Sequence, residues 1–418
     1  MTKPFGIFLL IYGLCSTWAL ASNRASGAPA PSLEPISSAE MGDAGPFDPV
    51  TVGQGIHFQS PDGTFSSTLR FRIQNRADFT FLEEEGDEGT RYLQDWQVRR
   101  ARLRFQGHVV DPKLRYLIQL SFSRADQDWD NSGVPNVLRD AMILYDVTDD
   151  WQVAFGQGKL PGNRQRVVSS GDLQFVDRSL LNARFNVDRD FGFQTQYKWM
   201  SGSSLMRLKG SITSGEGRNR NVPNRQRSFY VGRWEWLPFG EFQRNGDYFE
   251  GDLVFEETPK LSLAYSYASM PGAARAGGTI GNVLSTVDGD GNTIYLRRSQ
   301  HVQFVDGVLK WKGYAASFEY ATRQADDPVI DVADELGVLT GQGFNFQLSK
   351  MISEKVEVGA RYTQIDPTPE VRVLFDREAE KTLVLSRYFN GHRTKLQGEV
   401  SHLEGEQTVV RLQLELGI

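Results

Sequence analysis

Residues 408–418, the last of the chain, alternate from Val410 onwards between apolar side chains and other residues. The apolar set is Val410, Leu412, Leu414, Leu416 and Ile418, and the polar set between them is Arg411, Gln413 and Glu415. Successive side chains of a β-strand point to opposite faces, so this strand has one apolar face and one charged face. A strand that crosses a bilayer at a tilt needs about 9–11 residues. The pattern is therefore typical of a transmembrane β-barrel, with the apolar face towards lipid and the polar face towards a watery interior.

The same alternation recurs along most of the chain, between turns that are short at one end and longer at the other. Sixteen segments carry it: 67–81, 97–109, 114–123, 138–147, 151–158, 189–200, 204–214, 228–236, 260–270, 300–312, 314–324, 341–351, 356–366, 380–390, 394–403 and 407–417. The sequence thus predicts an all-β protein, a transmembrane antiparallel β-barrel of about sixteen strands. A secreted β-sandwich or propeller also has many short strands, but no propeller-like repeat period is visible.

The first residues have the features of a cleavable signal peptide. Lys3 is the positive end, Phe5–Leu14 is the apolar stretch, and Ala19, Leu20 and Ala21 form a small-residue cleavage site. The apolar stretch is shorter than the roughly 20 residues of a membrane-spanning helix. We expect residues 1–21 to be removed on export to the outer membrane of a Gram-negative-type envelope.

The remainder divides into a lead-in and one large domain. Residues 22–54 are mostly rich in Ala, Pro, Ser and Gly, which predicts a flexible periplasmic segment, and residues 55–418 form the predicted barrel. Cys15, the only cysteine, lies within the signal peptide, so the exported chain has no thiol chemistry. The net charge of −6 argues against a nucleic-acid partner. The mean hydropathy of −0.41 is compatible with a barrel, because alternation hides the apolar residues in the average.

Arginines are concentrated on the predicted inward faces of the first two strands. They are Arg70, Arg72 and Arg76 on the first strand, and Arg100, Arg102 and Arg104 on the second. Rows of positive side chains select anions in a pore, because a guanidinium replaces part of the hydration shell of the anion. The alternative is that the arginines pair with inward carboxylates, such as Glu357, Glu399 and Glu415, and only brace the wall.

Residues 159–188 form a long connection without strand periodicity. Its basic residues are Lys159, Arg164, Arg166, Arg178 and Arg184, which outnumber Asp172, Asp177 and Asp188. Above the barrel, this connection would expose several large apolar side chains, among them Leu160, Leu173 and Phe175. Folding into the barrel would bury them and narrow the channel. The alternative is a cap that narrows nothing.

Several segments, in order along the chain, resemble the phosphate-selective porin O and P family. They are 98–107 (VRRARLRFQG), 138–145 (LRDAMILY), 153–162 (VAFGQGKLPG), 175–183 (FVDRSLLNA), 188–192 (DRDFG), 356–366 (VEVGARYTQID) and 388–392 (YFNGH). The resemblance implies a sixteen-stranded outer-membrane porin, usually trimeric, whose third extracellular loop folds inward as a constriction. That loop matches residues 159–188. The family's basic lumen residues correspond here to Arg100, Arg102, Arg104, Lys159, Arg164 and Arg166.

Two features depart from the expected pattern. The chain ends in Ile418, where outer-membrane proteins usually end in an aromatic residue, and lysines are scarce. A lysine-rich phosphate site is therefore not evident.

The sequence favours a water-filled, anion-preferring diffusion channel with phosphate or polyphosphate as a candidate permeant. We expect a homotrimer in contact with outer-membrane lipid, with small anions as permeants and with no cofactor or metal site. The alternative is a non-selective or plugged structural barrel. A catalytic barrel finds no support, because no nucleophile motif is present, although catalytic triads assemble in space and not in sequence.

Overall fold

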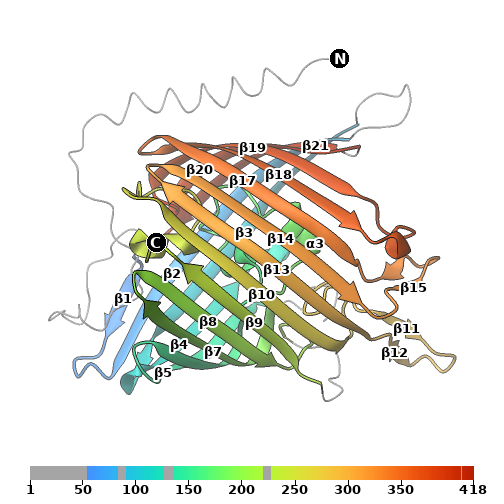
Figure 1. The fold of residues 1–418 in the computed structure, drawn as a ribbon, viewed down its shortest axis with the longest axis horizontal. Coiled ribbons are helices and arrows are strands. Elements are labelled where there is room, and N and C mark those ends of the chain that lie inside the picture. The colour runs from blue at the N-terminus through green and yellow to red at the C-terminus, as the bar shows by residue number, and fades with distance from the viewer. Residues whose placement is uncertain (1–53, 83–90, 127–135, 220–226, 406) are drawn as a thin grey trace.

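The protein is a closed antiparallel β-barrel of sixteen strands, as predicted (Figure 1). The structure is a computed structural model that describes residues 54–82, 91–126, 136–219, 227–405 and 407–418. The barrel strands are β2 (Phe65–Leu82), β3 (Arg91–Val109), β4 (Asp111–Ser121), β5 (Leu138–Asp146), β6 (Trp151–Lys159), β7 (Arg189–Ser201), β8 (Ser204–Thr213), β9 (Phe229–Leu237), β10 (Lys260–Ala273), β13 (Arg298–Trp311), β14 (Tyr314–Ala325), β17 (Gly341–Ser353), β18 (Val356–Pro367), β19 (Glu378–Asn390), β20 (Thr394–Leu403) and β21 (Gln407–Gly417). The predicted signal peptide and nearly all of the predicted lead-in lie outside the described residues.

The barrel closes where the first strand meets the last. β2 pairs with β3 on one side and with β21 on the other, from Leu82 opposite Gln407 to Arg72 opposite Gly417. Beyond that point, the short strand β1 (Ile56–Gln59) continues the ladder along β2. Backbone groups along the seam are thereby paired, as a sheet in lipid requires.

The faces of β21 follow the predicted alternation. Leu412, Leu414 and Leu416 are 37%, 50% and 48% exposed on the outside, whereas Gln413 and Glu415 are 1% exposed on the inside. A one-residue slip in register would exchange the two faces, so the hydrophobic pattern fixes the pairing of this strand.

Val410 shares the outward parity of these leucines but is only 5% exposed, so the prediction of an exposed side chain was wrong there. It lies directly opposite Phe79 of β2 and Val400 of β20. Side chains of directly opposite residues approach to about 4.5–5.5 Å between Cβ atoms, so Phe79 and Val400 flank this valine from both neighbouring strands.

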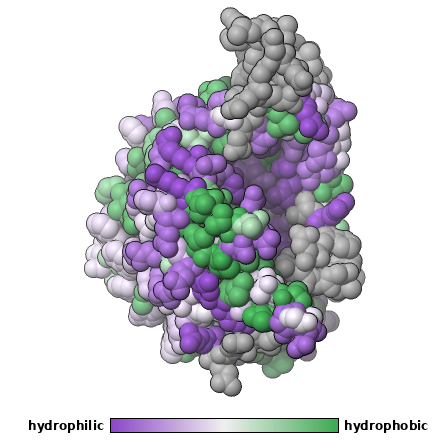
Figure 2. Space-filling model, turned by 90° about the vertical axis from the view of Figure 1, so that its right-hand side faces the viewer, coloured by the Kyte–Doolittle hydropathy of each residue, from purple (hydrophilic) through white to green (hydrophobic). Residues whose placement is uncertain are grey.

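Connections are short at one end of the barrel and longer at the other, and we call these the short end and the long end. The hairpins β11 (Ser285–Val287) with β12 (Thr293–Tyr295) and β15 (Val329–Asp331) with β16 (Leu336–Gly337) lie at the long end. The remaining helical turns are η1 (Arg124–Asp126), α2 (Arg164–Val167), α3 (Leu180–Arg184), η3 (Gln243–Tyr248) and η4 (Pro369–Val371). In a view of the long end, apolar residues form a patch beside a recessed hydrophilic area (Figure 2).

Two connections enter the barrel and position the site described below. The first is residues 160–188, between β6 and β7, which we call the inner loop. The second is residues 238–259, between β9 and β10 at the short end, which we call the short-end insertion. Within the described residues, no helix is both long and apolar enough to span a membrane.

Candidate pore and constriction

The inner loop lies inside the ring of strands, and α3 is visible there (Figure 1). Its residues bind inward-facing side chains of widely separated strands. Arg164 Nε lies 2.5 Å from Asp306 Oδ1 of β13, and the Val176 backbone N–H donates to Glu399 Oε2 of β20 over 2.9 Å. These contacts place the loop across the interior of the barrel.

An apolar cluster attaches one side of the inner loop to the wall. Leu160, Leu181, Phe185 and Val187 of the loop are at most 1% exposed. They pack with inward-facing apolar residues of β9, β10, β13 and β14, namely Phe229, Val231, Ala268, Met270, Val302, Phe304 and Ala321. The barrel is thus not lined by polar groups throughout. Where its inward face is apolar, the loop covers it.

Polar side chains of the wall satisfy the backbone of loop residues 170–177. Lys395 Nζ donates to the carbonyls of Gly171 and Leu173 over 3.0 and 2.6 Å, and Gln397 Nε2 donates to the Gln174 carbonyl over 2.8 Å. Buried backbone groups without a partner strand need such side-chain partners. The inward polar residues of β20 therefore hold the loop.

Three guanidinium groups meet one carboxylate where the loop passes β2 and β3. Arg76, Arg99 and Arg100 each contact Asp177 at 3.0 Å. Burial tends to raise the pKa of Asp177, but the positive charges of Arg100, Arg99 and Arg76 outweigh it and hold the pKa well below its ordinary value. Asp78 of β2 also contacts Arg76, at 2.9 Å. The guanidinium groups still outnumber the carboxylates, so this cluster carries excess positive charge.

Two further predicted pore arginines, Arg72 and Arg102, contact carboxylates. This is the alternative considered above, in which the arginines brace the wall. Arg102 Nε lies 2.5 Å from Asp126 Oδ2. Arg72 Nε lies 3.8 Å from Glu415, and its Nη2 donates to Ser170 Oγ over 2.8 Å. Their charges are therefore partly neutralised, and both also hold neighbouring segments in place.

Arg70 and Arg104 differ from the other predicted pore arginines. They lie directly opposite each other on β2 and β3, and both are partly exposed. Arg70 Nε donates to the Gln54 carbonyl over 3.2 Å. Within the described part of the chain, neither makes an ion pair with a carboxylate. Of the predicted pore arginines, these two have the least compensated charge.

The cations of the inner loop, and Lys159 at the end of β6 beside it, have separate roles. Arg166 Nε lies 2.6 Å from Asp188 Oδ1. Lys159 Nζ donates to the carbonyls of Val167 and Val168, over 3.2 and 3.0 Å. Arg178 Nη2 also donates to the Val168 carbonyl, over 2.8 Å. Lys159 and Arg178 thus bind carbonyl groups at the C-terminal end of α2, where positive groups are favoured.

Arg164 and Arg184 lie in different surroundings: Arg164 is buried against the wall, and Arg184 is partly exposed and lines a cavity near the long end. Arg164 is 4% exposed and sits between Asp306 and the Asp247 carbonyl, because it anchors the loop to the wall. Arg184 Nε lies 2.6 Å from Glu378 Oε2 near the long end. Arg164 is therefore part of the inner loop, and its guanidinium group anchors the loop to the wall.

Two β-bulges add inward arginines that the alternation could not predict. Arg100 and Val98 pair with consecutive residues of β2, so Arg99 is the extra residue of the first bulge. In β5, Asp140 and Leu138 pair with consecutive residues of β4, and Arg139 is the extra residue. A bulge re-aims a side chain, and strict period-2 reasoning assigns such a residue to the wrong face.

The comparisons with known proteins agree with the barrel fold. The family model described as phosphate-selective porin O and P matches residues 69–253. The predicted resemblance is confirmed. A search of curated proteins found no match.

Among solved structures, OmpF of Salmonella typhi in complex with daunomycin aligns with a TM-score of 0.53 at 11% identity, over 86% of this chain and all of the other. The outer membrane channel DcaP of Acinetobacter baumannii aligns with a TM-score of 0.50 at 12% identity, over 87% of this chain and all of the other. At these identities the two structures show the porin fold alone.

Proposed function

We propose that the protein is an outer-membrane porin that conducts small anions, phosphate among them, through a water-filled pore. The observation that carries the proposal is the cluster around Asp177, in which three guanidinium groups meet one loop carboxylate. Arg70 and Arg104 add positive charge without a carboxylate partner in the described part of the chain. The match to a phosphate-selective porin family supports the same direction.

The exposure of charged side chains supports a pore that runs off-centre, along β2 and β3. The side chains of Arg99 and Asp177 are 19% and 27% exposed. Those of Arg233 and Asp306, on β9 and β13, are both fully buried. Water therefore reaches the interior on the β2–β3 side of the inner loop, and the loop fills the β9–β13 side.

Fixed guanidinium groups in a narrow passage attract anions and repel cations. The planar fork of donors suits the oxygen atoms of phosphate and carboxylate, and the guanidinium stays charged at any working pH. Salt screens charges over about 8–10 Å at ordinary ionic strength, so the preference should be strongest in dilute salt.

The remaining parts of the proposal concern export and assembly. Residues 1–21 direct export and are removed, residues 22–54 are a periplasmic lead-in, and residues 55–418 form the barrel. The apolar outer face contacts lipid of a Gram-negative-type outer membrane, and three copies assemble. Transport is passive, and the protein uses no cofactor and catalyses no reaction.

The decisive measurement is the reversal potential in a planar bilayer under a potassium chloride gradient. We expect a sign that reports anion preference, and a preference that grows as the salt is diluted. Replacing Arg70 and Arg104 with glutamine should lower the anion-to-cation permeability ratio. The matched control replaces two exposed lysines, Lys198 and Lys381, with glutamine. It removes the same amount of positive charge and should leave the permeability ratio unchanged. Conductance without ion preference would favour the non-selective barrel, the absence of conductance would favour the plugged barrel, and cation preference would contradict the proposal outright.

A further inference from the structure

The short-end insertion enters the barrel opposite the inner loop and is anchored there by buried polar contacts. Tyr248 Oη donates to Glu235 of β9 over 2.6 Å, and Asp247 accepts from Arg207 of β8 over 2.5 Å. The Gly313 backbone N–H donates to Asp252 Oδ2 over 2.7 Å. These contacts lie along the insertion, so it is fixed to the wall before it reaches the loop.

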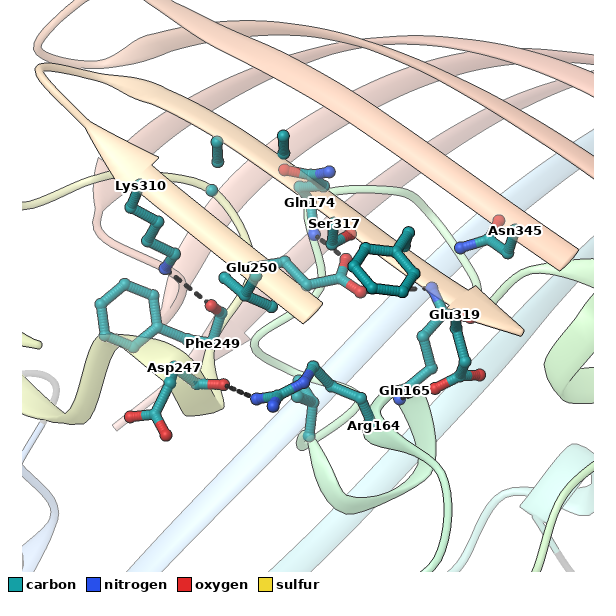
Figure 3. A pocket seen from close by; sticks show the side chains of 16 residues that line it. Arg164, Gln165, Gln174, Asp247, Phe249, Glu250, Lys310, Ser317, Glu319 and Asn345 are labelled. Carbon is teal, nitrogen blue, oxygen red and sulfur yellow. Dashed lines mark hydrogen bonds between the residues drawn. The ribbon is translucent and has the colours of Figure 1, made fainter. Parts of the chain in front are cut away.

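Glu250 joins the insertion to the inner loop (Figure 3). Its backbone N–H donates to the Asp172 carbonyl over 2.8 Å. Its carboxylate accepts from the Gln174 backbone N–H over 3.0 Å and from Gln165 Nε2 over 3.3 Å. Nearby, Arg164 Nη1 donates to the Asp247 carbonyl over 2.9 Å. The insertion therefore contacts the inner loop at two places, residues 164–165 and residues 172–174.

A neutral histidine supports Glu250 from the turn between β19 and β20. His392 is 6% exposed, and its Nε2 lies 2.8 Å from the Glu250 carbonyl. Burial and the charge of Lys395 lower the pKa of His392 to about 3. A neutral ring has one donor and one acceptor, so Nε2–H donates to Glu250 while Nδ1 accepts from Lys395 Nζ over 3.3 Å.

We propose that the short-end insertion positions the inner loop, and that Glu250 is the positioning residue through which it does so. The inner loop is attached to β6 and β7 at the long end, but the insertion that fixes its position, and with it the width of the pore, comes from the short end. This inference rests on the proposed function only in taking the inner loop as the wall of the pore.

The contact geometry explains why one residue carries this role. The inner loop leaves β6 and returns to β7 at the long end, so its middle is far from both attachment points. Wall side chains bind the carbonyls of residues 171, 173 and 174, while Glu250 binds the Gln174 N–H and the Asp172 carbonyl. Removing the carboxylate leaves the Gln174 N–H without its acceptor, and an unsatisfied buried donor favours an opened loop.

The test measures loop opening directly with a cysteine reporter. Ser169→Cys is introduced into a chain that lacks Cys15, and a charged thiol reagent modifies it in detergent-solubilised protein. In Glu250→Ala, the modification rate should rise about tenfold, which corresponds to about 1.4 kcal/mol of lost contact. Glu250→Gln keeps one carbonyl acceptor and should give a smaller rise. Glu257→Ala is the matched control, because Glu257 is exposed in the same insertion, and it should change nothing.

Equal modification rates in Glu250→Ala and Glu257→Ala, with unchanged β-sheet circular dichroism, would overturn the proposal. Should Glu250→Ala fail to fold, Glu250→Gln against Glu257→Gln decides in the same way. The rate of modification does not depend on which ions pass. A pore without anion preference would therefore contradict the proposed function and leave this result intact.

Discussion

At the scale of single residues, the lumen is organised by shared carboxylates. Asp177 receives three guanidinium groups, and Asp126 contacts both Arg102 and Arg139. The same arginines therefore hold the loop and keep excess positive charge beside the pore. Bracing and selection are not exclusive roles for these side chains. The sequence could predict Arg76, Arg100 and Arg102 as inward residues, but not the bulged Arg99 and Arg139. It could not predict their partners either, because Asp126 and Asp177 lie in connections without periodicity.

Replacing Asp177 with asparagine should raise the anion-to-cation permeability ratio. The substitution removes the negative charge that Arg76, Arg99 and Arg100 share and keeps the size of the side chain. The ratio follows from the reversal potential in dilute salt, where screening is weakest. Asp150→Asn makes the same charge change at an exposed turn of the short end and should have no effect. A ratio that falls, or that matches the control, would count against the cluster as the selectivity element.

The depressed pKa of Asp177 gives a prediction about acid. A carboxylate with a lowered pKa stabilises the docked loop above its ordinary pKa, and this stabilisation is lost only as the pH falls through the lowered value. The ordinary value for aspartate is about 3.9. The difference in permeability ratio between the native protein and Asp177→Asn should therefore stay constant from neutral pH to about pH 4. A difference that disappears near pH 5 would show that Asp177 titrates normally.

At the scale of elements, alternation predicted each of the sixteen barrel strands to within a few residues, apart from the start of β3. It failed wherever the chain leaves the period of two. β3 begins at Arg91, six residues earlier than expected, and β4 begins at Asp111, three residues earlier than expected. The hairpins and short helices of the connections carry no period long enough to detect. The bulge at Arg99 was also invisible, because the residues on both sides of it alternate correctly.

Deleting Arg99 should leave the barrel intact, whereas deleting Ala101 should not. Val98 and Arg100 already pair with consecutive residues of β2, so removing Arg99 restores a regular ladder with every face unchanged. Removing Ala101 instead turns Arg100 towards the lipid face, at a cost of about 2–4 kcal/mol near the bilayer centre.

The yield of folded barrel, measured by circular dichroism after refolding into lipid vesicles, compares the two deletions. The folded Arg99 deletion should also show a lower anion preference, since one guanidinium group is gone. Equal yields from the two deletions would mean that the bulge does not set the faces of β3.

At the scale of the whole molecule, two connections from opposite ends meet inside one barrel. The apolar inward faces of β9, β10, β13 and β14 exist because the inner loop covers them, and the sequence shows them only as inward positions that lack charge. Burial of the loop could be predicted from its own apolar residues. Its partners could not, because contacts between distant segments leave no local pattern. For the same reason, the contact between Arg164 and Asp306 could not be predicted.

The outward leucines of β21 allow a test of how the whole barrel sits in a membrane. Leu412 lies near the middle of β21, and Leu416 lies near the end of β21 that is at the short end of the barrel. An arginine on the lipid face costs about 2–4 kcal/mol at the bilayer midplane and about 0–1 kcal/mol near the interface. In lipid vesicles, Leu412→Arg should therefore lower the free energy of unfolding by roughly 2 kcal/mol more than Leu416→Arg. Denaturant titrations of the two variants and the native protein measure this difference.

In detergent the difference should shrink, because detergent tails adapt around a charge more easily than a bilayer does. Equal losses in vesicles would mean that the middle of β21 does not lie at the centre of the bilayer.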